Sequence, residues 1–453
     1  MKQHSPVPPL LGEVQALASL GIVQLLVQAL LTGTFAAFVI GAFRFAYTKV
    51  GLFLQTCVGS HDLAEPCHLA LLTALLLLAS IVSALLLRYE PLISGSGIPQ
   101  VELMLAGRLP LMNWARVLLA KFTGTLISLS AGLSLGREGP CVQMGACAGL
   151  AVQRLLRQAE RSSAGRFLIG GGVAGMTAAF GAPLAGLFFA FEEMRVVLTL
   201  PLLLFTAVTA FSAYAVIHSF LGFDLVFPFQ AKDALSLSQY WLVLPLGIGL
   251  GLLGAFYNAL LVRLTLLIDR LKLSPWLRLL PVFLLSGMLL LFFPLILTHF
   301  GLAALDLSHL SLPLKLLLLL LLAKILFSAI SFASGASGGL LMPMLMAGAL
   351  FGCMASQLFL ASGVIHSSQA DVPIILAMAG LFAATVRAPL TGSALLMEMS
   401  GCPELALALL ATALTAVFVA NRLASEPVYE SLKQRLLTLQ KLAEEPSQHK
   451  KSE

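Results

Sequence analysis

The sequence predicts an all-α polytopic membrane protein, and two observations support this fold class. Hydrophobic residues make up 59% of the chain and charged residues only 11%, whereas soluble domains carry about 25% charged residues. Five apolar stretches are each long enough to cross roughly 30 Å of hydrocarbon as a helix: residues 15–47, 68–88, 242–268, 277–298 and 312–332. Leu and Ala dominate these stretches without the alternation of barrel strands, so we expect helices.

The first apolar run is too long for the hydrophobic part of a cleaved signal peptide, so we expect the chain to retain it. The net charge of +6 is explained by the excess of Lys and Arg on the cytoplasmic side of membrane proteins. Basic residues do not cluster outside short loops and the tail, so nucleic-acid binding is not expected. Short loops fit a multi-pass protein of a bacterial inner membrane, with both termini cytoplasmic.

The six cysteines show no metal-ligand spacing, and we expect neither a metal nor a cofactor. Cys141, Cys147 and Cys353 lie in apolar stretches and are predicted to be small core residues. Cys57 and Cys67 flank a polar loop. They either form a disulfide or remain separate thiols, because spacing alone does not decide pairing.

A weak internal repeat relates the two halves of the chain. Adding 203 to the numbers of Lys121, Gly136, Pro140 and Gly145 gives Lys324, Gly339, Pro343 and Gly348. The motif GAPLAG at 181–186 recurs as RAPLTG at 387–392, an offset of 206. The matched lysines are expected to be structural, with tuning of the local potential by Lys121 as the alternative.

The repeat predicts two similar membrane halves joined by a more polar linker. The predicted divisions are a cytoplasmic N-terminal segment at 1–14, a first half at 15–215, a linker at 216–240, a second half at 241–425, and a C-terminal helix with a charged cytoplasmic tail at 426–453. Transporters built from such halves bind their substrates near the membrane midplane, where the halves meet.

Five Gly- and Pro-rich segments interrupt the apolar stretches, and a helix-forming run follows each: GSGIPQ (95–100), GREGP (136–140), GAPLAG (181–186), SGASGGLLMP (334–343) and RAPLTG (387–392). Because Pro suits the first turn of a helix, each segment predicts a helix start inside the membrane. Exposed N–H groups and the helix dipole attract anions at such starts. Close helix packing is the alternative for a single glycine motif, but five motifs in two matched sets favour an anion site.

The segments GSGIPQVE, GREGPCVQMG, AAFGAPLAGLFFAFEEM, SGASGGLLMPML and RAPLTG together resemble the CLC family of chloride channels and transporters, over about residues 20–435. The resemblance is to proton-coupled chloride antiporters of the prokaryotic type without CBS domains. It implies an inverted-repeat CLC fold of many tilted, partly spanning helices. It also implies secondary active H⁺/Cl⁻ exchange by a homodimer with one pathway in each subunit.

The resemblance also implies site residues. Those expected to bind chloride, through hydroxyls or backbone N–H groups, are Ser96, Leu340, Leu341 and Tyr429, with the motif glycines Gly95, Gly97, Gly136, Gly139 and Gly339 around them. Glu138 resembles the external gating glutamate, and Glu193 resembles the internal glutamate that transfers protons to the cytoplasm. Leu341 stands where the family usually has Phe, which keeps the backbone donor but changes the pathway wall. An interfacial aromatic is the alternative for Tyr429.

Four carboxylates lie within apolar segments and are functional candidates for that reason: Glu138, Glu192, Glu193 and Glu398. Adding 206 to Glu192 gives Glu398, so this pair is present in both halves. Such a pair suits a structural role, either capping a helix or pairing with Arg195 or Arg387.

Glu138 and Glu193 have no acidic counterpart, because the repeat places Leu341 and Met399 at the matching positions. An unmatched carboxylate favours a function of its own. Beside a helix start, ionised Glu138 mimics an anion and occupies the place of chloride, and protonation releases it. The structural alternatives are a helix cap for Glu138 and a salt bridge near the membrane surface for Glu193.

A passive anion channel of the same fold is the nearest alternative function, and the presence of Glu193 favours exchange over it. A fluoride exporter fits less well, because GSGIP and the late tyrosine match the chloride type. An intramembrane enzyme is the alternative from another class. It would need a Ser/His pair or metal ligands within the membrane, and the chain has no HExxH motif.

Overall fold

The computed structural model describes residues 21–59, 66–158, 161–197, 199–222, 227, 233–292 and 312–449, and within these ranges the chain is helical with two isolated β-bridges. The predicted segment at 1–14 lies outside the described residues. So do the side chains of Cys57 and Cys67, and with them the predicted choice between disulfide and thiols.

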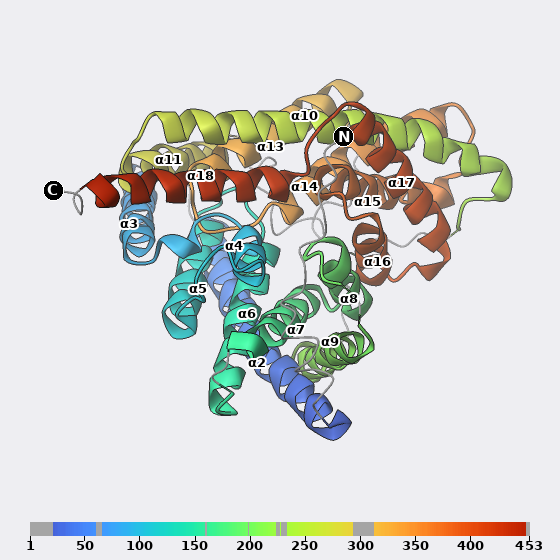
Figure 1. Cartoon of the computed structure of the whole chain (residues 1–453). Coiled ribbons are helices and arrows are strands. Elements are labelled where there is room, and N and C mark those ends of the chain that lie inside the picture. Colours follow the sequence, from blue (N-terminus) through green and yellow to red (C-terminus); the bar gives the residue numbers. More distant parts are fainter. Residues whose placement is uncertain are drawn as a thin grey trace.

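The helices of the sequence up to the polar linker are α2 (Ile22–Gly59), α3 (Pro66–Tyr89), η1 (Pro91–Ile93), α4 (Ile98–Leu105), α5 (Trp114–Ser130), α6 (Glu138–Leu155), α7 (Arg161–Phe180), α8 (Pro183–Glu192) and α9 (Leu200–Leu221). Those that follow are η2 (Leu237–Leu242), α10 (Val243–Arg270), α11 (Pro275–Phe292), α13 (Leu314–Ala333), α14 (Leu341–Ala361), η3 (Ser367–Gln369), α15 (Val372–Val386), α16 (Pro389–Ser400), η4 (Pro403–Leu405), α17 (Ala406–Arg422) and α18 (Val428–His449). In Figure 1 the earlier helices, apart from α3, fill the lower part of the view and the later ones the upper part.

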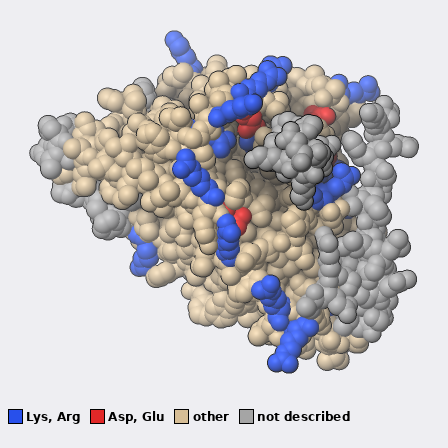
Figure 2. All heavy atoms as spheres, turned by 60° about the vertical axis from the view of Figure 1, so that its left-hand side comes forward, with Lys and Arg blue, Asp and Glu red and all other residues tan. Residues whose placement is uncertain are grey.

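Among the described residues, nine helical stretches are long and apolar enough to cross a membrane: Ile22–Leu52, His68–Tyr89, Leu200–Phe220, Leu237–Arg270, Pro275–Phe292, Leu314–Ala333, Leu341–Ala361, Ser367–Val386 and Pro403–Arg422. They overlap all five stretches expected from the sequence, two of which extend outside the described residues, and a multi-pass α-helical membrane protein is confirmed. Helices satisfy their own backbone groups, as the hydrocarbon core requires. Accordingly, Figure 2 shows a broad expanse of uncharged surface.

Each of the five Gly- and Pro-rich segments ends in a helix start. The helices α4, α6, α8, α14 and α16 begin at Ile98, Glu138, Pro183, Leu341 and Pro389. Adding 203 to the first residue of α6 gives that of α14, and adding 206 to the first residue of α8 gives that of α16. The repeat seen in the sequence therefore marks equivalent helix starts.

Glycines bring α6 and α7 into backbone contact. A Cβ atom at Gly145 would collide with the carbonyl oxygen of Gly171, and one at Gly171 would collide with that of Gly145. Small residues at helix contacts allow such close approach within membranes. Cys141 and Cys147 of α6 and Cys353 of α14 are buried, as expected for core residues.

The carboxylates Glu192 and Glu398 cap helices reciprocally. Glu192, at the end of α8, accepts the backbone N–H groups of Leu390 at 2.9 Å and Thr391 at 2.7 Å, and also the Thr391 hydroxyl at 2.8 Å. Glu398, near the end of α16, accepts two backbone N–H groups in the first turn of α8, each at 3.0 Å. The capping interpretation of this matched pair is confirmed.

The other structural interpretation of the pair, an ion pair with Arg195 or Arg387, is wrong. Arg195 lies 3.0 Å from the carboxylate of Glu430, and Arg387 donates to the side chain of Asn421 and the carbonyl of Ser425. The N–H groups at a helix start are unpaired and carry the positive end of the dipole, so they hold both carboxylates without a cation.

Candidate ion-binding site

Backbone hydrogen bonds bring together the starts of α4, α6 and α14, which lie far apart in the sequence. Gly136 and Gly339 exchange two N–H···O bonds of 2.7 Å just before α6 and α14 begin. Gly95, before α4, donates to Ala336 at 3.2 Å and accepts from Gly338 at 3.1 Å. Three helix N-termini from both halves therefore converge on one region inside the protein.

Two glycines with positive φ shape the start of α4. Gly95 has φ 65° and Gly97 has φ 99°, a region that side chains other than glycine rarely adopt. Gly97 is the N-cap of α4, and Ser96 lies between the two glycines.

Glu138 is the first residue of α6, and its side chain is buried against the start of α14. The backbone N–H of Leu341 donates to the Glu138 Oε1 atom. A Cβ atom at Gly136 or at Gly339 would collide with this carboxylate. These N-termini, with the two glycines that leave room between them, form a place for a negative charge, which we call the anion site.

Ser96 and Tyr429 lie next to the anion site. Both side chains are buried, and the Tyr429 hydroxyl approaches that of Ser96. The Ser96 oxygen makes no hydrogen bond of regular geometry with the described residues. It lies against Gly139, directly after Glu138, where a Cβ atom would collide with it. Burial of Tyr429 inside the protein overturns its alternative interpretation as an interfacial aromatic.

Leu340 completes the set of predicted chloride ligands, as the fully buried N-cap of α14 beside Leu341. All the predicted site residues around the anion site come from α4, α6, α14, α18 and the turns before them. Glu193 is different, because it lies at the C-terminal end of α8.

Lys121 has a structural role that the sequence anticipated. Its buried ammonium group donates to the carbonyl oxygens of Ile93 at 2.9 Å and Gly95 at 2.7 Å. Ile93 ends η1 and Gly95 precedes α4, so Lys121 connects the segment before α4 to α5.

Glu193 is buried, and its Oε1 atom has no hydrogen-bond partner among the described residues. Within the same part of the chain no salt bridge to Glu193 is present, so the ion-pair interpretation has no support there. The neighbouring Glu192 instead caps α16. Two adjacent glutamates therefore have different surroundings.

The sequence interpretation missed a buried ion pair near Glu193. The Lys433 ammonium lies 2.6 Å from the carboxylate of Glu102 and 2.9 Å from that of Glu430. Two signals point to this pair. Glu102 belongs to the same GSGIPQVE motif as Ser96, and Lys433 follows Tyr429 by one helical turn, so it shares its face of α18.

Comparison with known proteins identifies the family. The family model described as voltage gated chloride channel matches residues 75–421. The H(+)/Cl(−) exchange transporter ClcA of Vibrio parahaemolyticus serotype O3:K6 is 36% identical over 444 residues, covering 93% of this chain and 91% of that protein. The transporter of the same name from Yersinia pestis bv. Antiqua (strain Angola) is 34% identical over 387 residues, covering 81% of this chain and 79% of that protein.

Solved structures show the same fold. A slow cyanobacterial Cl⁻/H⁺ antiporter matches with a TM-score of 0.85 and 29% identity, covering 91% of this chain and 98% of that one. A CLC-type fluoride/proton antiporter, 20% identical with a TM-score of 0.74, shares the fold. The chain belongs to the CLC family of chloride channels and transporters, a family of transport proteins rather than enzymes, and its helices adopt the CLC fold.

Proposed function

We propose that this protein exchanges H⁺ for Cl⁻ across the membrane by secondary active transport. The observation that carries the proposal is the buried Glu138 carboxylate, held by backbone N–H groups at the start of α14. Relatives named H(+)/Cl(−) exchange transporters, similar over most of the chain, support the same function.

Chloride binds, in this proposal, at the anion site and beside it. Its ligands are the hydroxyls of Ser96 and Tyr429 and the backbone N–H groups of Leu340 and Leu341. Partial charges on hydroxyls and helix N-termini attract the ion. They hold it less tightly than a fixed cation in a low dielectric would, so chloride can leave again.

Protons are coupled to chloride through competition for the anion site. Ionised Glu138 takes up the N–H groups that would otherwise attract chloride. A neutral carboxyl group loses that attraction and leaves the site, so chloride enters after a proton has bound. Glu193 transfers protons between this region and the cytoplasm.

A passive channel is the alternative function, and the environment of Glu193 favours exchange over it. A buried carboxylate with a free oxygen atom is costly unless the site uses it. A pathway that conducts chloride alone has no need for such a group.

The test is proton uptake driven by a chloride gradient into liposomes that contain the purified protein. We expect wild type to move both ions, and Glu138→Gln and Glu193→Gln to move chloride while proton uptake is lost. Proton coupling that survives in either variant would remove that residue from the mechanism. A wild-type protein that moves chloride alone would establish the passive channel.

We also propose a homodimer with one pathway in each subunit, in a bacterial inner membrane with cytoplasmic termini. The bacterial relatives support the location. The division into halves at 15–215 and 241–425, with a linker at 216–240, remains part of this proposal. It is supported by the equivalent helix starts.

A further inference from the structure

Helix α18 links the chloride ligands to a charged cluster. Tyr429 and Lys433 lie one turn apart on it, and α18 packs against α4. The α4 segment is arranged in the same way, with Ser96 just before its N-cap and Glu102 in its last turns. The α4 segment and α18 therefore each carry one proposed chloride ligand and, further along, one member of the Lys433–Glu102 ion pair.

Glu102, which forms the ion pair with Lys433, and Glu193 are both buried. The Glu102 Oε2 atom lies 2.6 Å from the Lys433 ammonium, while its Oε1 atom has no hydrogen-bond partner among the described residues. The Oε1 atom of Glu193 is unpartnered in the same way. Arg195, two residues after Glu193, and Lys433 both bind the Oε2 atom of Glu430, at 3.0 and 2.9 Å, so Glu193 lies close to the Lys433–Glu102 pair and the three groups form one charged cluster.

The other charged groups around the cluster are already balanced or engaged. Glu430 is bound by Arg195 at 3.0 Å as well as by Lys433 at 2.9 Å, so it keeps a cation when Lys433 is replaced, and the Glu192 carboxylate caps α16. Lys433 is therefore the cation that offsets Glu102 directly, and Glu193 remains as the carboxylate of the cluster without a cation bound to it in the described structure.

We propose that Lys433 is a positioning residue for proton transfer, which neutralises Glu102 so that Glu193 takes up and releases protons without a second carboxylate charge beside it. The inference rests on the proposed role of Glu193. Two nearby carboxylates without a cation hold a shared proton tightly, because each ionised group disfavours ionisation of the other. Loss of Lys433 therefore traps the proton that Glu193 must release.

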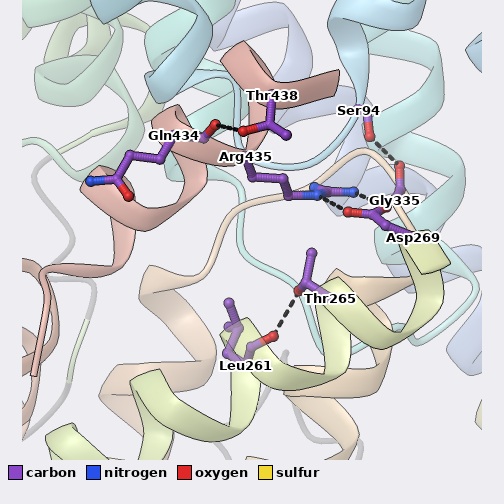
Figure 3. A network of polar contacts seen from close by, with 8 residues as sticks. All are labelled: Ser94, Leu261, Thr265, Asp269, Gly335, Gln434, Arg435 and Thr438. Atoms are coloured by element: carbon purple, nitrogen blue, oxygen red, sulfur yellow. Dashed lines mark hydrogen bonds and ion pairs between the residues drawn. The ribbon is translucent and has the colours of Figure 1, made fainter. Parts of the chain in front are cut away.

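A second ion pair on α18 provides a matched control. Arg435 binds Asp269 at the end of α10 through two contacts of 2.6 and 2.8 Å, and Figure 3 shows its guanidinium group directed at that carboxylate. Removing Arg435 takes an ion pair away from α18 but leaves the contact of Lys433 with Glu102 intact. The two variants separate the charge of Lys433 from the attachment of the helix.

The experiment measures proton and chloride flux in liposomes for Lys433→Met, Lys433→Arg, Arg435→Met and the double variant Lys433→Met/Glu102→Gln. We expect Lys433→Met to lower the proton flux roughly tenfold, the effect of about one pH unit in proton affinity, while chloride flux persists and reports that the protein is folded. Lys433→Arg and Arg435→Met should keep proton flux near wild type. The double variant should regain it, because Glu193 then lies beside a neutral glutamine instead of a carboxylate charge without a cation.

Three results would overturn the inference: normal proton flux in Lys433→Met, an equal loss in Arg435→Met, or a double variant as defective as Lys433→Met. The last would mean that Glu102 itself carries protons or that the ion pair acts through the fold. Failure of the proposed exchange is distinguishable, because it would appear in wild type as chloride movement without protons.

Discussion

At the scale of single residues, the anion site depends on glycines, which leave space because they have no side chain, as much as on Glu138. Glu138 reaches the N–H group of Leu341 only because Gly136 and Gly339 leave its carboxylate room. The same space would admit chloride once the carboxylate has left. Glycine at these positions therefore serves both states of the proposed exchange.

Gly339→Ala should displace the Glu138 carboxylate from the anion site. Overpacking of this kind costs about 1–3 kcal/mol. This free energy corresponds to a decrease of roughly 5- to 150-fold in the occupancy of the conformation in which the Glu138 carboxylate lies in the anion site. We expect proton uptake per chloride to fall by a comparable factor in liposome flux assays, approaching Glu138→Gln. Gly21→Ala is the control, since a Cβ atom there meets nothing within 4 Å. Full coupling in Gly339→Ala would show that Glu138 does not depend on this space.

At the scale of helices, α8 and α16 hold each other in place by their ends. Each carries a glutamate near its C-terminal end that accepts backbone N–H groups at the start of the other. Glu193 is the residue next to the Glu192 cap. The position of the proposed proton-transfer group therefore follows from the packing of two helices related by the repeat.

Glu398→Ala should destabilise the protein by about 1–2 kcal/mol, because it leaves two N–H groups of α8 without their acceptor. The measurement is the thermal unfolding midpoint in detergent, with Glu404→Ala as the control because Glu404 is exposed on η4. The midpoint should fall for Glu398→Ala and stay unchanged for Glu404→Ala. Equal midpoints for wild type and Glu398→Ala would show that the cap contributes nothing to stability.

At the scale of the whole molecule, one chain supplies every residue of the proposed pathway. The N-termini of α4, α6 and α14 meet inside a single copy, and Tyr429 reaches the same region from α18. The anion site, as proposed, is formed by residues of one copy. Assembly into dimers should therefore leave each pathway independent.

Mixed assemblies test this independence. When wild type is co-expressed with Glu138→Gln at varied ratios and purified together, proton flux should decrease in proportion to the wild-type fraction. A linear dependence is expected because each copy holds a complete site. A steeper decrease would mean that one subunit controls the other.

Much of this architecture could be predicted from local patterns in the sequence. Long apolar runs predicted the membrane-spanning helices, because burial in hydrocarbon depends on composition over about twenty residues. Pro and Gly marked the five helix starts through their own backbone preferences. The offset of 203 even paired Glu138 with Leu341, and the two residues are in contact in the structure.

Only the tertiary structure decided which distant groups meet. It showed that Glu192 and Glu398 cap helices rather than bind Arg195 or Arg387, and that Lys433 binds Glu102. It also placed Tyr429 against Ser96, which in the sequence rested on resemblance alone. Periodicity and propensity report local free energies of burial and backbone conformation. Contacts between residues hundreds of positions apart depend on how helices cross and where each one ends, and no local pattern records that.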